Sequence, residues 1–201
     1  MESGLSRATA LLVGACLSIP GQVIEFESNG LKYQSLSKRG ITLMVAQLPG
    51  HVREFTILQV AVSNGSAGPY IIRPEDFTYR KNDGSELRAW PANDVVELLR
   101  EKGGRSVVMK LVSAYENALY GIPHMKVANA YESRRQAALA AVASTKLKAA
   151  AAASAIAFVS TKLLPGQSTD GAVFFGAEGH AFGPGHLVVR TNTDVFEFQG
   201  E

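Results

Sequence analysis

The stretch VANAYESRRQAALAAVASTKLKAAAAASAIAFVSTKL, residues 127–163, decides how the rest of the chain can be organised. It is rich in alanine, has few charges and contains neither Gly nor Pro, which is typical of a helix. The segments before Trp90 and after Pro165 have the pattern of short strands instead. The sequence therefore predicts a β domain in two halves, with a helical middle at residues 91–164 inserted between them.

Three helices are predicted in this middle. The first is a short helix that follows Pro91 and ends at Gly103-Gly104, where glycine readily takes the left-handed stop. The second covers residues 107–119, where apolar residues recur at three- and four-residue spacing. The third is residues 127–163, whose apolar stripe has small residues at its centre. Small side chains allow close approach, so we expect the last two helices to form an antiparallel hairpin.

The strand predictions rest on turns and on alternation. Asn29-Gly30 lies between short apolar runs, which is a strong hairpin signal. Residues 54–63 alternate with a period of two, so Leu58, Val60 and Val62 are expected to point into a core. Further turns are predicted at 82–84 and 191–194. Strands at such regular spacing are typical of a β-sandwich.

Two longer runs carry a resemblance to a known class of domain. VAVSNGSAGPYIIRPEDFTYRKNDGSEL, residues 60–87, and LLPGQSTDGAVFF, residues 163–175, resemble patterns of uncharacterised bacterial secreted immunoglobulin-like domains. The resemblance implies an immunoglobulin-like fold and export. Together with the residue pattern it predicts an α+β chain in which residues 22–201 form an immunoglobulin-like antiparallel β-sandwich with the 91–164 segment as a helical insertion. Such domains share an architecture rather than a chemistry, so the resemblance implies no catalytic residues.

Composition limits the classes of function. Twenty Lys and Arg against eighteen Asp and Glu give a net charge of +2, which argues against nucleic-acid binding through phosphate contacts. The single cysteine excludes an internal disulfide framework. The sequence has no GxSxG elbow, phosphate-binding loop or HExxH motif. We therefore expect a protein that is not an enzyme and that has no cofactor.

The N-terminus predicts export. Residues 1–21 contain about twelve mostly apolar residues, the length of a signal-peptide core and too short for a membrane span. Val13-Gly14-Ala15-Cys16 resembles a bacterial lipobox, so Cys16 is a candidate for lipidation. Export would place the chain in the periplasm or cell envelope, with or without a lipid anchor. The alternative is a buried first element in which Cys16 is a core residue.

A candidate partner face is predicted on the long helix. Leu147 and Phe158 project away from its apolar stripe and are framed by Lys146, Lys148 and Lys162. The main hypothesis is an interaction or structural module that binds a protein partner, or a second copy of itself, through this face. Two alternatives remain open. The face can rest on the sheet, or it can contact a membrane surface.

The loop GAEGHAFGPGH, residues 176–186, supports a second function. Its His180 and His186, with Glu178 as the nearby carboxylate, could meet at a metal or line a site. Histidines without fixed spacing on a regular element are more often plain loop residues, so no metal site is assigned. The alternative hypothesis is a small-ligand binder, a metal binder or a hydrolase that uses this loop.

Overall fold

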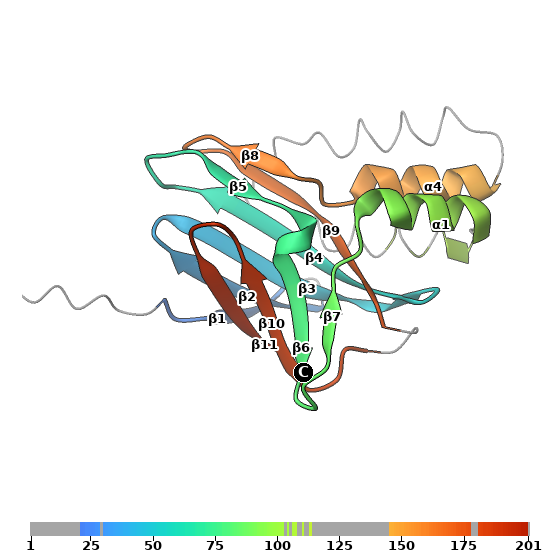
Figure 1. Cartoon of the computed structure of the whole chain (residues 1–201), viewed down its shortest axis with the longest axis horizontal. Helices are drawn as coiled ribbons and strands as arrows, with labels where there is room; N and C mark the ends of the chain where they lie inside the picture. The colour runs from blue at the N-terminus through green and yellow to red at the C-terminus, as the bar shows by residue number, and fades with distance from the viewer. Residues whose placement is uncertain are drawn as a thin grey trace, which may run out of the picture.

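The computed structural model of the chain describes residues 21–28, 30–102, 104, 106, 107, 110, 113, 145–177 and 181–200. For residue 50 and residues 145–149 it describes the backbone alone. The described part consists mainly of antiparallel β-sheet, with two α-helices, α1 (Ala92–Lys102) and α4 (Thr145–Ile156), beside the larger sheet (Figure 1).

Eleven strands form three sheets in the described residues. The larger sheet has the order β1-β2-β3-β4-β9, the smaller sheet has the order β11-β10-β6-β7, and β5 pairs with β8 as a short ribbon. Every pairing between these strands is antiparallel. The strands are β1 (Ile24–Ser28), β2 (Leu31–Lys38), β3 (Ile41–Val52), β4 (Phe55–Asn64), β5 (Tyr70–Ile72), β6 (Phe77–Lys81), β7 (Glu86–Arg88), β8 (Thr161–Leu163), β9 (Ser168–Gly176), β10 (Gly185–Arg190) and β11 (Val195–Gly200), and a 3-10 turn, η1 (Pro74–Asp76), precedes β6.

The predicted turns join neighbouring strands as expected. Ser28 pairs with Leu31, so a two-residue loop connects β1 to β2, and Gly30 has a φ of 73°, which a residue with a side chain rarely adopts. The turn at 82–84 connects β6 to β7, and Asp83 accepts hydrogen bonds from the backbone and hydroxyl of Ser85. The 191–194 turn connects β10 to β11. These predictions are confirmed.

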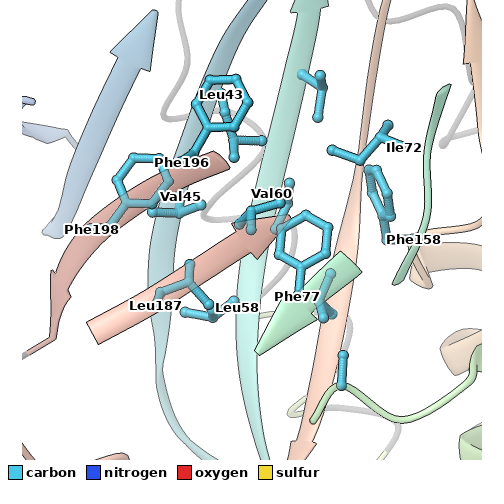
Figure 2. Close-up of a cluster of buried hydrophobic side chains, with 14 of the residues drawn as sticks. Leu43, Val45, Leu58, Val60, Ile72, Phe77, Phe158, Leu187, Phe196 and Phe198 are labelled. Atoms are coloured by element: carbon cyan, nitrogen blue, oxygen red, sulfur yellow. The ribbon is translucent and has the colours of Figure 1, made fainter. Parts of the chain in front are cut away.

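The two large sheets pack face to face through one hydrophobic cluster. Leu58 and Val60 of β4 enter it from the larger sheet, and Phe77 of β6 and Phe196 of β11 enter it from the smaller sheet. Figure 2 shows these side chains converging between the two layers. The predicted inward direction of Leu58, Val60 and Val62 is confirmed, because all three belong to this cluster.

A second cluster lies on the other face of the larger sheet. Phe55 and Ile57 of β4 point away from the first cluster and pack with Val95 and Leu99 of α1 and Ile156 of α4. The residues of β4 from Phe55 to Val62 are therefore all buried, although a strand covered on one face would alternate. The helices form a third layer over the larger sheet. Side chains of α1 and α4 therefore belong to the hydrophobic packing of the fold.

The long helix ends earlier than predicted. Within residues 127–163, α4 stops at Ile156, and Thr161–Leu163 form β8 rather than a last helical turn. The backbone N–H of Phe158 donates to the Ala172 carbonyl of β9 at 2.8 Å, which draws the chain onto the sheet. The boundary at 164 is thus corrected, because pairing with β9 and β5 outweighs local helix propensity. Residues 127–144 and most of the predicted 107–119 helix lie outside the described residues.

Candidate functional site

A cavity of about 580 Å³ opens at one end of the sandwich, between the two large sheets. It lies where β2 begins and β11 ends, beside the middle of β3. Its walls come from both sheets and from the loop that precedes β10. The lining residues are Glu25, Phe26, Gly30, Leu31, Lys32, Tyr33, Gln34, Val45, Ala46, Gln47, Leu48, Pro49, Leu58, Tyr79, Ala181, Phe182, Leu187, Phe198, Gln199 and Gly200.

The deep wall of the cavity is apolar. Val45 and Leu58 come from the larger sheet, and Leu187 and Phe198 come from the smaller sheet. Figure 2 shows these four side chains directed toward one another between the layers. Leu187 and Phe198 are cross-strand partners in the β10–β11 register, so both project from the same face of that sheet. The wall therefore offers hydrocarbon surface and no charged group.

An aromatic stack closes another side of the cavity. The ring of Phe182 stacks on Tyr79 with centroids 4.3 Å apart and meets Phe175 edge-on at 5.1 Å. The Tyr79 hydroxyl donates to the Gly183 carbonyl, which ties the same loop to β6. Burial raises the pKa of Tyr79 above its ordinary value, so this hydroxyl keeps its proton. Ala181 and Phe182 are thereby held in place as part of the wall.

Two paired glycines make room for the Tyr79 ring. Gly185 of β10 and Gly200 of β11 lie opposite each other in the register. A Cβ added to Gly200 would come within 1.8 Å of the Tyr79 hydroxyl oxygen, and one added to Gly185 would come within 2.9 Å of Cε1 of the same ring. A residue with a side chain at either position would collide with the Tyr79 ring or its hydroxyl. The position of the aromatic wall therefore depends on both glycines.

Polar groups gather at the mouth of the cavity. Glu25 and Gln34 face each other in the β1–β2 register, and the Gln34 amide Nε2 donates to Glu25 Oε1 at 2.9 Å. The other amide atom, Gln34 Oε1, is shielded from water and has no hydrogen-bond partner. Gln47 and Gln199 are exposed at the same mouth. The cavity thus combines an apolar interior with an amide-rich rim.

Tyr33 lines the cavity and also belongs to the hydrophobic cluster on the helix-covered face of the larger sheet. Its ring stacks on Phe26 of β1 at 5.2 Å, and its hydroxyl donates to Gln59 Oε1 at 3.2 Å. Burial raises the pKa of Tyr33 to about 12, so the hydroxyl remains a donor at neutral pH. Tyr33 stiffens the β1–β2 hairpin that forms the outer wall of the cavity.

A smaller cavity of about 300 Å³ lies between the β3–β4 turn and the end of α1, lined by His51, Val52, Arg53, Gly104, Ser106, Val107 and Lys110. Its most prominent cation, Arg53, already donates to the carbonyl of Lys102. A guanidinium at that position satisfies a carbonyl at the C-terminal end of α1, where a positive charge is favourable. The geometry assigns Arg53 this structural role and no ligand.

The histidine loop contributes to the larger cavity, but not through its described histidine. Ala181 and Phe182 line the wall, whereas His186 lies exposed on β10. His180 and Glu178 lie outside the described residues. Within the described part of the chain, no group of three or more His, Cys, Asp or Glu side chains is placed to hold a metal ion.

The predicted partner face is not assembled as expected. Phe158 is only 1% exposed and meets the Phe77 ring at 5.7 Å inside the first cluster, so its assignment to a surface is wrong. It lies beyond the end of α4, where the chain follows β9. The alternative that this side rests on the sheet therefore holds for Phe158. Lys162 is exposed on β8. The side chains of Lys146, Leu147 and Lys148, and the whole of Cys16, lie outside the described residues.

Sequence reasoning missed the cavity because its walls come from strands far apart in the chain. The available signals were local and weak: Gly185 and Gly200 at the ends of two paired strands, and Phe182 within a glycine-rich loop. None of them specifies a cavity until the register of β10 and β11 and the position of β6 are known.

Comparison of the chain with protein-family models, with curated proteins and with solved structures finds no match. Neither helix in the described part of the chain has the length and apolar character needed to traverse a lipid bilayer.

Proposed function

We propose that this chain is a non-catalytic binding module that takes up a small apolar molecule between its two sheets. The observation that carries the proposal is the cavity of about 580 Å³, whose wall joins Val45, Leu58, Leu187 and Phe198 to the Tyr79–Phe182 stack. Ligand sites are typically clefts of about 300–1,000 Å³ with mostly apolar walls and a few polar groups. The volume and lining of this cavity match that description.

The rigidity of the walls supports the same proposal. Val45 and Leu58 project from β3 and β4, which pair with each other and are central strands of the larger sheet. The helix layer buries the opposite face of β4, so this strand is packed on both faces and has little freedom to move. A cavity whose shape is held in advance loses less conformational entropy when a ligand enters.

The proposal includes an immunoglobulin-like connectivity for the sandwich. In that fold one sheet contains strands A, B and E and the other contains G, F and C, with an added C′ in some members. The orders β3-β4-β9 and β11-β10-β6-β7 follow the same sequence of strands, which supports the assignment. The helices then lie between C′ and E. The β1–β2 hairpin is an addition beside strand A, and it supplies the rim of the cavity.

The contact with a protein partner through the helical insertion stays a prediction, as do export and lipid anchoring through Cys16. Burial of Phe158 removes the larger of the two apolar residues on which the partner face was predicted. The cavity supports the alternative hypothesis of a small-ligand binder instead. The loop on which it rested places Ala181 and Phe182, rather than His186, at the cavity.

The experiment replaces a residue of the cavity wall with a larger one, so that the new side chain occupies the cavity. We expect the full chain to bind the fluorescent apolar probe N-phenylnaphthylamine saturably, and Val45→Phe to weaken binding by about tenfold or more, since the added ring occupies the ligand space. Val159→Phe is the matched control, because Val159 is 48% exposed and does not line the cavity.

Circular dichroism melts establish that each variant is folded, and Leu187→Phe replaces Val45→Phe if the latter does not fold. The proposal fails if the wild-type chain shows no saturable binding, or if folded Val45→Phe and Leu187→Phe bind the probe as the wild type does.

A further inference from the structure

The larger sheet ends in β1, whose outer edge is accessible to solvent. β1 pairs with β2 alone in the order β1-β2-β3-β4-β9, and residues 24–27 are all exposed. In the described part of the chain, no backbone hydrogen bond of these four residues leads outside the β1–β2 pair. The outward N–H and C=O groups of an edge strand can pair with an added strand. β1 therefore offers hydrogen-bonding groups along an accessible edge.

The apolar side chains of β1 distinguish it from the two edge strands of the smaller sheet. Ile24 is 63% exposed and Phe26 is 36% exposed. On β11, Phe196 and Phe198 are buried in the first cluster, and on β7, Leu87 is half-buried. Charged residues on an edge strand oppose pairing with other chains, whereas exposed apolar residues favour it. The apolar residues of β1 therefore indicate a surface for association.

The two faces of β1 differ in charge. Phe26 stacks on Tyr33, which belongs to the second cluster, so Ile24 and Phe26 lie on that side of the sheet. Glu25 and Glu27 alternate with them and project to the other side. Neither carboxylate forms an ion pair with a described residue. Along the edge, apolar side chains on one face thus alternate with negative charges on the other.

We propose that β1 is the docking edge for an extended segment of a partner protein in which basic and apolar residues alternate. The basic side chains lie beside Glu25 and Glu27, the apolar side chains lie beside Ile24 and Phe26, and the partner backbone adds one strand to the larger sheet. A second copy of this chain fits poorly. Antiparallel pairing of two β1 strands about Phe26 would place Glu25 of each copy opposite Glu27 of the other.

The experiment uses a dye-labelled synthetic peptide with the sequence Thr-Val-Lys-Val-Lys-Val-Thr-amide as the probe. We expect fluorescence anisotropy to show saturable binding of this Lys peptide to the full chain. The Glu peptide, which has Glu in place of both Lys residues, should bind at least about tenfold more weakly. Two pairs of opposite charge across the strands become two pairs of like charge in that complex. This comparison uses the wild-type chain, so it does not depend on the folding of a variant.

Two N-methylated forms of the Lys peptide test the backbone pairing. Successive residues of a strand direct their N–H groups to opposite edges, so methyl groups on one alternate set of residues block pairing with β1 and methyl groups on the other set do not. One form should bind about as the parent peptide does, and the other at least about tenfold more weakly. If both forms bind as tightly as the parent, the attraction is electrostatic only, and strand pairing is overturned.

The protein-side test is Glu25→Gln combined with Glu27→Gln, which keeps the side-chain size and removes both charges. This variant should bind the Lys and Glu peptides with affinities within about twofold of each other. Glu86→Gln with Glu197→Gln is the matched control, because these exposed carboxylates lie on β7 and β11, and it should keep the preference for the Lys peptide. Val45→Phe occupies the cavity and should bind the Lys peptide as the wild type does.

Circular dichroism melts establish that each variant is folded. The proposal is overturned if the Lys peptide shows no saturable binding, if the Glu peptide binds as tightly, or if the folded double variant of β1 keeps the preference. Loss of Lys-peptide binding in folded Val45→Phe would place the peptide in the cavity and overturn the edge assignment. Sedimentation velocity addresses the second copy, since a wild-type dimer that the peptide dissociates would assign the edge to self-association instead.

Discussion

At the scale of single residues, the strands carry glycines where another part of the chain comes close. Gly171 of β9 lies under the backbone of Phe158, and a Cβ at this position would meet Phe158 Cα at 2.6 Å and its nitrogen at 2.8 Å. The contacting atoms are mainly backbone atoms, which cannot rotate away as the end of a flexible side chain can. Gly171 therefore allows the segment after α4 to lie on the sheet and bury Phe158.

We expect Gly171→Ala to lower the free energy of unfolding by about 1–3 kcal/mol, because the added methyl group forces the Phe158 backbone off β9. Equilibrium urea unfolding followed by circular dichroism measures this. Gly68→Ala is the control, since a Cβ there meets nothing within 4 Å. Equal stability of the two variants would show that the segment after α4 can shift to accept the methyl group without lowering the free energy of unfolding.

At the scale of elements, β4 connects all three layers. Leu58 and Val60 face the smaller sheet, while Phe55 and Ile57 face α1 and α4. Alternation along the strand is visible in the sequence and predicts that Leu58, Val60 and Val62 point into a core, but it does not say what covers the opposite face. The outer face is apolar because helices cover it, and that covering depends on where α1 and α4 pack.

We expect Leu99→Ala in α1 to lower the free energy of unfolding by about 2–5 kcal/mol, the usual cost of removing a fully buried leucine side chain. Leu98→Ala is the matched control, because Leu98 is half-buried on the same helix and should cost clearly less. Urea unfolding of both variants gives the comparison. If Leu99→Ala cost no more than Leu98→Ala, α1 would not be a structural layer of the fold.

At the scale of the whole molecule, the halves before and after the helices form one unit. β9 pairs with β4, and β10 pairs with β6, so both large sheets need strands from each half. The two hydrophobic clusters lie on opposite faces of the same larger sheet. Disruption of either half therefore removes partners from both cores.

Deletion of residues 166–201 tests this unity, because it removes β9, β10 and β11 together. We expect the truncated chain to lose the cooperative thermal transition, as one domain with shared cores unfolds as a unit. Near-ultraviolet circular dichroism during heating measures the loss. Deletion of Glu201 alone is the control and should melt as the full chain does. A truncated chain that still melted cooperatively would contradict the shared cores.

The sequence by itself determined the features that depend on neighbouring residues. The turns at Asn29-Gly30, 82–84 and 191–194, the strand pattern on both sides of the helices and the short helix after Pro91 all follow from local conformational preferences. A glycine-rich loop was also identified as a candidate site, although for its histidines rather than for Phe182.

Only the tertiary structure decided which apolar residues are covered and by what. Phe158 follows an alanine-rich helix, and its spacing along the predicted helix placed it away from the apolar stripe. The backbone hydrogen bond from Phe158 to Ala172 and the space at Gly171 instead bring its side chain into the core. The cavity likewise exists because Tyr79 of β6 lies over Gly185 and Gly200, residues more than a hundred positions later in the chain. Local propensities differ by a few tenths of a kcal/mol per residue, whereas burial of a large side chain contributes about 1.5–3 kcal/mol, so long-range packing decides these positions.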